Sequence, residues 1–556
     1  KNPDIMYVGL GEPQLRQSVS WGDGMYKTVD GGETWEHIGL EDSLHIARVR
    51  IHPDNPDVVF VASMGHAFGP TEERGVLRTR DGGKTWERVL FQNELTGAID
   101  LVMSPGDPNV LFAALWTFER KAWGSFFGGP DGGIWRSRDG GDSWEEITTN
   151  PGLPEGDTGR IGLTMSAADP DRVYALVDSA TQTGLYRSDD LGENWSFVTA
   201  DANITARPFY FTHIYANPSN ADELWSPANK LWRSVDAGKT WILEPSAKDD
   251  FQDIWIDPQD PMRMIATCDG GTAVTLTGGK SWSSFANQSG VQFYRVDTDD
   301  QFPYRVYGNA QDLLTYSIPS SSRWGGIPLH MTDFIGNGET GRAIPRPGDP
   351  NIVYGLSTGA TFGAATQFTV NNLKTGQTEP RPVWPEILFG TPASEFKYRF
   401  NWQAPFLVSP HDPNTIYFAG NVVFRSRDEG MTWEKISDDL THNLTDKMKV
   451  AGSEWLPEYF GQETFSTIHR LEESPHEEGV LWAGTDDGRV WITRNGGGTW
   501  TEVTPPGLPE LSGVYEIEVS PHDKATTYLA ITRYRKADDY DPYLLKTADY
   551  GQTWKR

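Results

Sequence analysis

The residues of this sequence best suited to chemistry are carboxylates that stand in variable segments among aromatic side chains. A pair of carboxylates about 5–10 Å apart can hydrolyse a glycosidic bond, with one acting as acid and the other as base or nucleophile. The sequence does not fix such separations, so it leaves this chemistry open. Six carboxylates could supply the pair: Glu72, Glu119, Asp312, Glu339, Glu458 and Glu463.

No motif identifies catalytic residues. The sequence has no Gly-x-x-x-x-Gly-Lys phosphate loop and no pair of histidines at His-x-x-x-His spacing. The single cysteine, Cys268, lies in an apolar segment that reads as a strand (264–268), without a basic neighbour to activate its thiol. We therefore leave the catalytic residues unassigned and predict no cofactor and no bound metal.

Several variable segments mix aromatic rings with arginine, histidine and carboxylates, as a ligand-binding face does. They span residues 11–22, 65–74, 117–132, 207–213, 398–402, 455–469 and 533–543. From them and from the carboxylates above we predict these ligand-binding residues: His66, Glu72, Arg74, Glu119, Arg120, Trp123, Arg207, Tyr210, His213, Asp312, Glu339, Arg399, Trp402, Glu458, Tyr459, His469, Arg533 and Asp541.

The elements that must position these residues come from a repeat. Nine segments share the pattern Ser/Thr-x-Asp-x-Gly-x-Thr/Ser-Trp, at 28–35, 79–86, 137–144, 188–195, 234–241, 275–282, 426–433, 493–500 and 547–554. Thr277 and Asn495 replace the aspartate in two of them. A period of roughly 50 residues in a sequence rich in β-formers indicates a propeller or a β-solenoid.

The residue types of the motif predict a tight hairpin. The aspartate can accept hydrogen bonds from the turn's own amides, the glycine supplies a positive φ, and the tryptophan buries a ring against the next sheet. One carboxylate is far from the six to eight oxygens that calcium prefers, which argues against a metal loop. We assign this structural role to Asp30, Trp35, Asp81, Trp86, Asp139, Trp144, Asp190, Trp195, Asp236, Trp241, Asp428, Trp433, Trp500, Asp549 and Trp554.

Upstream of each motif stands an alternating strand, a Pro/Asp turn and an apolar strand, as at residues 46–62; the turn and the apolar strand recur at 104–114 and 409–419. Each repeat therefore predicts a four-stranded antiparallel blade, and the chain holds about eleven blades. The long interval between Thr277 and Asp428 has room for two blades that lack the motif, and the turn at 346–350 supports one there. In such blades the motifs lie on one face and the variable segments on the other.

Composition limits the possible partners. The formal charge of −29 argues against a nucleic-acid partner, since phosphate binding needs a basic surface. No apolar run approaches the roughly 20 residues needed to span a membrane. With one cysteine no intrachain disulfide can form. We predict a secreted, periplasmic or cell-surface bacterial protein whose partner is a peptide, a protein or a polysaccharide.

The nine motifs resemble those of the Asp-box (BNR) repeat families over essentially the whole chain. Strings such as GHAFGP (65–70), FPYRVYG (302–308) and DPY (541–543) are most similar to bacterial sortilin-like propeller proteins, often labelled glycosyl hydrolases. The architecture is also similar to that of xyloglucan-degrading hydrolases, which pair two seven-bladed propellers and take one catalytic aspartate from each. The two resemblances imply a ligand-binding propeller and a glycoside hydrolase, respectively.

The blade count favours two tandem seven-bladed propellers, at residues 1–288 with about six blades and 289–556 with about five. The alternative is a single ten-bladed, sortilin-like ring. Because the chain begins and ends inside a blade, and sheets avoid open edges, we expect the natural protein to continue at both ends.

The leading functional hypothesis is an extracytoplasmic propeller that binds a peptide, protein or glycan on its variable face. The alternatives are a polysaccharide-degrading glycoside hydrolase and a structural surface or assembly component.

Overall fold

The computed structural model describes residues 2–16, 19–245, 249–285, 290–311, 313–335, 338–359, 364–385, 391–458 and 464–556. They form eleven sheets, two single-turn helices, α1 (Ala202–Thr205) and α2 (Tyr534–Ala537), and three 3-10 turns (Leu329–Met331, Ala393–Glu395, Thr445–Lys447). The prediction of an all-β, multi-bladed fold with four-stranded blades is confirmed. None of the helices in the described residues has the length and apolar character needed to cross a membrane.

The chain divides into two compact units. Unit 1 comprises Lys1–Arg120, Ser125–Ser289 and Gly452–Pro457, and unit 2 comprises Lys121–Gly124, Gly290–Ala451 and Glu458–Arg556. The contacts described below lie within one unit or the other.

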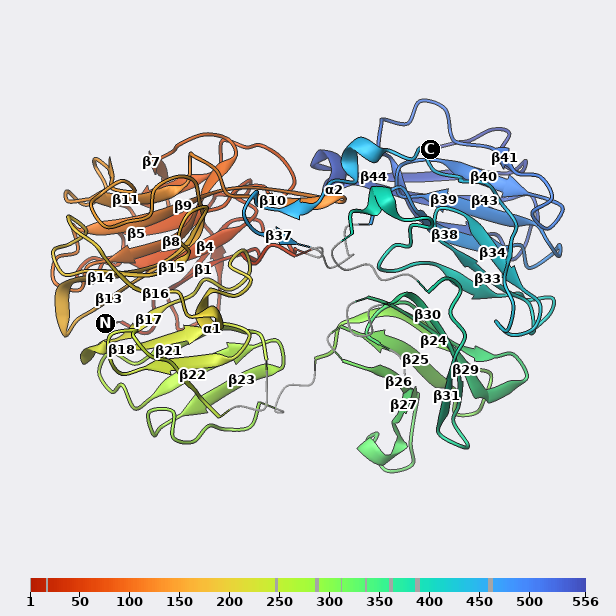
Figure 1. The fold of residues 1–556 in the computed structure, drawn as a ribbon, viewed down its shortest axis with the longest axis horizontal. Helices are drawn as coiled ribbons and strands as arrows, with labels where there is room; N and C mark the ends of the chain where they lie inside the picture. The colour runs from red at the N-terminus through yellow and green to blue at the C-terminus, as the bar shows by residue number, and fades with distance from the viewer. Residues whose placement is uncertain are drawn as a thin grey trace. The chain divides into compact units, whose positions relative to one another are not determined.

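Unit 1 contains six sheets (Figure 1). They are β1–β3 (Met6–Gly9, Met25–Thr28, Glu36–His37), β4–β7 (Ile46–Ile51, Val59–Ser63, Gly75–Thr79, Glu87–Leu90), β8–β12 (Thr96–Met103, Leu111–Lys121, Gly124–Phe127, Gly133–Ser137, Glu145–Glu146), β13–β16 (Thr158–Ser166, Asp169–Ser179, Gly184–Ser188, Ser196–Thr199), β17–β20 (Tyr215–Asn217, Asn220–Pro227, Leu231–Ser234, Ile242–Leu243) and β21–β23 (Phe251–Ile256, Met264–Cys268, Gly271–Thr275).

Unit 2 contains five sheets (Figure 1). They are β24–β27 (Phe293–Thr298, Arg305–Ala310, Thr315–Pro319, Asp333–Ile335), β28–β31 (Ala343–Arg346, Asp349–Gly359, Ala364–Asn372, Gln377–Pro380), β32–β35 (Phe406–Val408, Ile416–Ala419, Val423–Ser426, Glu434–Lys435), β38–β41 (Ile468–Glu473, Leu481–Thr485, Val490–Thr493, Thr501–Glu502) and β42–β44 (Gly513–Val519, Thr527–Arg533, Asp539–Thr547). The first two occupy the long interval between Thr277 and Asp428.

Successive sheets pack face to face through apolar side chains. In unit 1, Tyr174, Leu176 and Leu185 of one sheet pack against Ile214 and Leu224 of the next, all of them buried. The first strands of consecutive sheets are neighbours in both units, as for β4, β8 and β13. The first strands therefore gather their side chains into one region of each unit.

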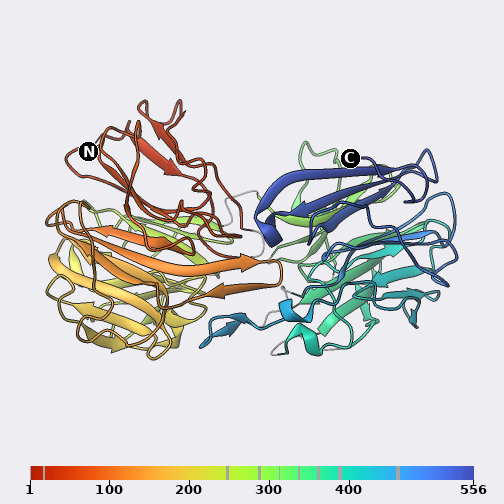
Figure 2. The same ribbon diagram turned by 90° about the horizontal axis from the view of Figure 1, so that it is seen from above.

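One hairpin of unit 1 projects from its sheet. Strand β9 has 11 residues and turns back into β10, so the pair extends beyond the rest of its sheet (Figure 2). Two short strands, β36 (Ala451–Gly452) and β37 (Pro457–Glu458), continue this sheet, with Gly452 opposite Phe126.

The repeated motif forms a hydrogen-bonded turn at the end of each third strand. At Asp81, Oδ1 accepts from Thr79 Oγ1 at 2.8 Å and from the Thr85 amide at 3.0 Å, while Oδ2 accepts from Thr85 Oγ1 at 2.7 Å. The amide of Gly83 donates to Thr79 Oγ1. Gly83 has φ +97°, and a Cβ there would lie 2.5 Å from the Ile38 side chain, so the turn requires glycine.

Arginines on third strands link each sheet to the next. Arg425 Nη1 donates to the carbonyl oxygen of Gly496, which lies in the following sheet's turn, at 3.0 Å. Arg78 and Arg136 reach the carbonyls of Gly140 and Leu191 in the same way. The motif tryptophans add a second link, as where Trp86 Nε1 donates to Ile38 O at 2.7 Å.

Replacing Asp81 by alanine should lower the melting temperature by a few degrees, because it removes three hydrogen bonds that close the turn. The hydrogen bonds from the Thr85 amide, Thr85 Oγ1 and Thr79 Oγ1 lower the pKa of Asp81 to about 2. The melting temperature of the wild type should therefore exceed that of Asp81→Ala above about pH 4, and this difference should disappear as the pH falls through about 2. Calorimetry across this range tests both statements, with Glu33→Ala, at an exposed position of a neighbouring turn, as the control. Equal melting temperatures for Asp81→Ala and wild type at pH 7 would contradict the assignment.

Candidate functional site

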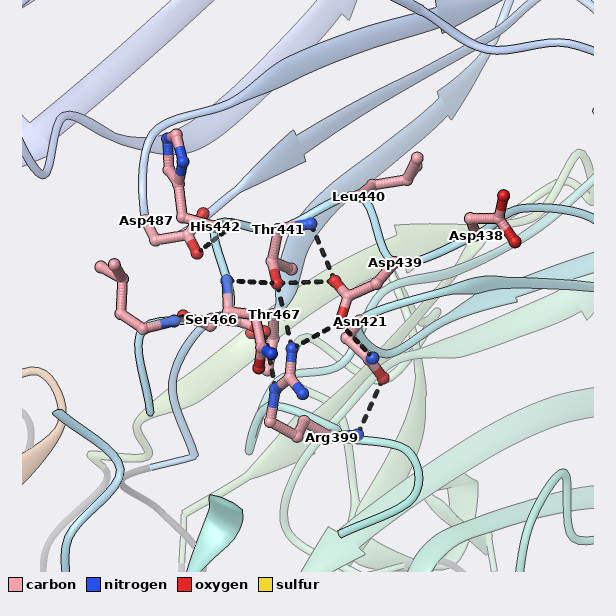
Figure 3. A network of polar contacts seen from close by, with 12 residues as sticks. Arg399, Asn421, Asp438, Asp439, Leu440, Thr441, His442, Ser466, Thr467 and Asp487 are labelled. Carbon is pink, nitrogen blue, oxygen red and sulfur yellow. Dashed lines mark hydrogen bonds and ion pairs between the residues drawn. The ribbon is translucent and has the colours of Figure 1, made fainter. Parts of the chain in front are cut away.

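The densest polar network of unit 2 lies in the loops that join its last sheets. We call it the loop network and define it by Arg399, Asn421, Asp439, Thr441, His442, Thr467, Asp486 and Asp487. Arg399 precedes β32, Asp439 to His442 follow β35, Thr467 precedes β38, and the two aspartates follow β39. Figure 3 shows most of these side chains converging from separate segments.

Arg399 and Asp439 form the fixed part of the network. Arg399 is 5% exposed, and its Nη2 donates to Asp439 Oδ2 at 2.8 Å and to Thr441 Oγ1 at 3.0 Å. Asn421 Nδ2 donates to the same carboxylate oxygen (Figure 3). Burial alone would raise the pKa of Asp439, but hydrogen bonds from Thr441 and Asn421 outweigh it and lower this pKa. Asp439 is therefore ionised at neutral pH.

Asp487 connects two of the loops. Its Oδ2 accepts from the His442 backbone amide at 2.8 Å (Figure 3). Its Oδ1 accepts from Thr485 Oγ1 at 2.6 Å. The residue is 2% exposed. A buried carboxylate held in this way fixes the link before β38 against the turn after β39.

Asp486 is the perturbed carboxyl of the network. Its Oδ1 accepts from the Thr467 amide at 2.8 Å and its Oδ2 from Thr467 Oγ1 at 2.7 Å. Burial first, and the adjacent charge of Asp487 second, raise the pKa of Asp486 to about 7. The carboxyl is thus partly protonated at neutral pH, and it is held in one orientation by a single threonine.

Lys536 of α2 lies beside this pair. A Cβ added to Gly513 would stand 2.0 Å from Lys536 Nζ and 2.6 Å from the backbone oxygen of Asp486, so the three residues are in close contact. Burial lowers the pKa of Lys536 to about 8, although the charge of Asp486 opposes the shift. An acid and a base whose pKa values both lie near neutrality suit proton transfer.

Three arginines predicted to bind ligand are buried instead. Arg74 is 0% exposed and donates to the carbonyl oxygens of Leu95, Phe118, His66 and Gly69 at 2.7–3.4 Å. Arg120 is 1% exposed and donates to Arg16 O and Ser125 Oγ. Together with Arg399, they hold loops in place, and we assign them to structure rather than to ligand contact.

The predicted aromatic and histidine residues are also mostly buried. Tyr210 and Trp402 are each 8% exposed, and Trp402 Nε1 donates to Tyr294 Oη. His213 is 4% exposed, and burial followed by the charge of Arg160 holds its pKa well below the ordinary value. Burial likewise lowers the pKa of His469, whose ring lies 5.1 Å from that of Tyr515.

The remaining predicted residues are dispersed. Glu72 pairs with Arg88 at 3.9 Å, and Arg207 with Asp250 at 3.9 Å. Glu339 accepts from Gln311, and Trp123 lies 5.3 Å from Phe465. His66 and Glu119 are partly buried, and Asp541 is exposed. Arg533 pairs with Asp539 rather than with Asp541. Asp312, Tyr459 and Glu463 lie outside the described residues, as does the side chain of Glu458.

Two other features bear on chemistry. Cys268 ends strand β22, as predicted. Residues 355–359 have the Gly-x-Ser-x-Gly spacing of a nucleophile elbow, but they lie inside strand β29, whereas an elbow requires a strand-to-helix turn. Within the described residues, no three acidic, histidine or cysteine side chains are grouped so as to hold a metal ion.

Of the loop network, the sequence predicts only Arg399. Asp439, Asp486 and Asp487 stand in stretches that lack aromatic residues, whereas Lys536 lies within the predicted segment 533–543 but is not singled out there. A usable signal exists in Thr485-Asp486-Asp487-Gly488, where two adjacent acids follow a fully buried strand on the variable face.

The sequence matches no family model. It is similar to a xyloglucanase from Paenibacillus sp, with 26% identity over 341 residues covering 52% of this chain and 31% of that protein. It is also similar to a probable oligoxyloglucan-reducing end-specific xyloglucanase from Neosartorya fischeri, with 21% identity covering 53% of this chain and 36% of that protein. The matches thus span about a third of the length of these relatives.

Among solved structures, the GH74 xyloglucanase from Xanthomonas campestris aligns with a TM-score of 0.40 at 16% identity, covering 99% of this chain and 81% of that one. The sequence matches favour the resemblance to xyloglucanases over the resemblance to sortilin-like proteins.

Proposed function

We propose that the chain is a glycoside hydrolase that cleaves a branched β-glucan of the xyloglucan class. The observation that carries the proposal is the Asp486 carboxyl, which is held by Thr467 and has a pKa of about 7 beside a second carboxylate. The similarity to two xyloglucanases supports the substrate class. The binding-only hypothesis favoured by the sequence takes second place.

Asp486 is proposed as the general acid. In glycoside hydrolysis the acid donates its proton to the glycosidic oxygen as the C–O bond breaks. Water adds its hydroxyl group to the anomeric carbon, and the remaining proton of that water restores the protonated acid, so no net proton is consumed. A carboxyl with an ordinary pKa would be ionised at neutral pH and could not donate. Burial and the neighbouring charge of Asp487 keep part of the Asp486 population protonated. A polysaccharide substrate would also place the protein outside the cytoplasm.

The test compares turnover with binding on the same polysaccharide. The purified chain is incubated with xyloglucan, and new reducing ends are measured; affinity electrophoresis in gels containing xyloglucan measures binding. Release of reducing ends from xyloglucan, with much slower release from unbranched carboxymethyl cellulose, is the expected result. Retarded migration without any product would overturn the hydrolase proposal and support a carbohydrate-binding propeller. Neither product nor retardation would overturn both.

A further inference from the structure

A second polar cluster lies in unit 1, far along the chain from the loop network. Five successive sheets contribute to it from the first strand of each: β4, β8, β13, β17 and β21. We call it the first-strand cluster, and its members are Arg48, Arg50, Asp100, Arg160, Tyr215 and Asp253.

Arg48 is the centre of the cluster and has all its nitrogens engaged. Its Nε lies 3.1 Å from Asp100 Oδ1, its Nη1 3.4 Å from Asp253 Oδ2, and its Nη2 donates to Tyr215 Oη at 2.8 Å. Strands from four sheets therefore converge on one guanidinium. Both carboxylates of the cluster are already committed to it.

Arg160 is buried without a carboxylate partner of its own. It is 2% exposed, and its Nη1 donates to the carbonyl oxygens of Phe209 and Tyr210 at 3.0 and 3.2 Å. Its Nη2 lies 3.3 Å from Nε2 of His213, which is neutral because its pKa is well below the ordinary value. Burial, and then the charge of Arg48, lower the pKa of Arg160 to about 9. The charge of Asp100 opposes this shift, but within the described residues Arg160 forms no ion pair with a carboxylate.

Arg50 is two residues from Arg48 on β4, so its side chain projects from the same face of the strand. Within the described residues its hydrogen bond is to the carbonyl oxygen of Val49, from Nη1 at 3.1 Å. A guanidinium has five N–H donors, so most of those of Arg50 are available to a ligand. Burial and the nearby Arg48 charge lower the pKa of Arg50, which is the direction expected where positive charge is uncompensated.

The equivalent strands of unit 2 have a different charge balance. On or beside them stand Arg295, Arg342 and Arg470, and four carboxylates face these arginines: Asp297, Glu472, Glu516 and Glu518. Arg342 pairs with Asp297 at 2.7 Å, and Arg470 pairs with Glu516. In unit 1 three arginines face two carboxylates. The surplus of positive charge is thus a property of unit 1 and not of the repeat.

We propose that the first-strand cluster of unit 1 binds a small oxyanion, a sulfate, phosphate or carboxylate group, with the Arg50 guanidinium as its principal ligand. The planar fork of arginine matches two oxygens of such a group. Arg48 and Arg160 supply the surrounding positive potential, which is stronger in a partly desolvated site than in water. This site does not depend on the proposed hydrolase activity, because it uses neither the loop network nor a sugar.

The test is binding of inorganic anions to the whole chain. Sodium sulfate, sodium phosphate and sodium acetate are titrated against sodium chloride at equal ionic strength, with calorimetry for affinity and thermal unfolding for stabilisation. Saturable binding of at least one oxyanion at one site per chain is expected. Arg50→Gln should weaken it at least about tenfold, the loss expected for charge-assisted hydrogen bonds. Arg80→Gln, which removes an exposed arginine paired with Glu87 and Asp142, should leave the affinity unchanged.

A second variant tests the charge argument in the opposite direction. Asp253 has a side chain that is 49% exposed, so Asp253→Asn should fold, and Arg48 keeps its partner Asp100. Removing this negative charge should increase the oxyanion affinity several-fold. The proposal is overturned if no oxyanion binds more strongly than chloride, if Arg50→Gln binds as the wild type does, or if Asp253→Asn weakens binding.

Discussion

Replacing Asp486 by asparagine is expected to lower kcat on xyloglucan by about 10²–10⁴-fold, the usual contribution of a general acid. Asparagine keeps an oxygen to accept from the Thr467 amide, and its amino group can donate to Thr467 Oγ1, so the local geometry can persist. What the variant lacks is the proton that the leaving group needs. Initial rates of reducing-end release at saturating substrate measure the effect.

The pH profile provides an independent check on the same residue. Since burial raises the pKa of Asp486 to about 7, the acid form is depleted above this value. Wild-type kcat should therefore fall about tenfold per pH unit above pH 7, and the residual rate of Asp486→Asn should lack this limb. A wild-type profile that is flat between pH 6 and pH 9 would contradict the role of Asp486.

The stability of this variant should change in the opposite direction to its activity. The folded-state pKa of Asp486 lies above the unfolded value of about 3.8. The stability that its protonated form contributes is therefore complete below about pH 3.8 and is lost as the pH rises through about 7. At pH 8, asparagine removes a buried charge, and the melting temperature should rise. Asp438→Asn is the control, since Asp438 stands next to Asp439 of the loop network, after β35, and its side chain is fully exposed. A melting temperature of Asp486→Asn below that of the wild type at pH 8 would indicate that the Asp486 carboxylate stabilises the fold and is not a catalytic acid.

Replacing Arg74 by alanine should destabilise unit 1 by about 3–5 kcal/mol, the range for breaking a buried charged network. The Arg74 guanidinium donates to four carbonyl oxygens, and the residue has no exposed surface. The variant leaves those carbonyls buried without their donors and opens a cavity beside Phe118, whose ring centroid lies 4.0 Å from the guanidinium carbon.

Denaturant titration followed by tryptophan fluorescence measures the Arg74→Ala effect. Arg88→Ala is the control, because the Arg88 side chain is 34% exposed and its partners, Glu72 and the ring of Phe91, are themselves exposed. The control should change the free energy of unfolding by less than about 1 kcal/mol. A loss for Arg74→Ala as small as that of the control would mean that water replaces the guanidinium, and that the loop is more open than its contacts indicate.

The fold class could be predicted from sequence because its signals are local. The hydrogen bonds of each motif join residues at most four positions apart, as from Asp81 to Thr85, so one short window contains the whole turn. The two sheets that follow Thr277 lack the motif; the width of the interval predicts two blades there, and the Pro/Asp turn at 346–350 identifies one of them.

The candidate site could not be predicted in the same way. Asp486 is distinctive only because Thr467, 19 residues away, holds its carboxyl and because burial removes water from it. Neither cause is visible in the local sequence. Conversely, Arg74 directly precedes β6 and Arg120 lies near the end of β9, both in segments that the sequence predicts to bind a ligand. Folding places backbone carbonyls around their guanidinium groups, and only tertiary structure shows this.

The arginines that reach from one sheet into the next sheet's turn have a consequence for how disorder can spread. Each of them joins nearest neighbours only, as Arg425 does with Gly496. The coupling that these arginines supply along the third strands is then a sum over adjacent pairs of sheets. A sheet with two neighbours is held by such hydrogen bonds on both sides, whereas a sheet at the end of a series is held on one side only. Local unfolding should therefore begin at the end sheets and proceed inward one blade at a time. A substitution that breaks one turn should destabilise the adjacent sheets most and the more distant sheets less.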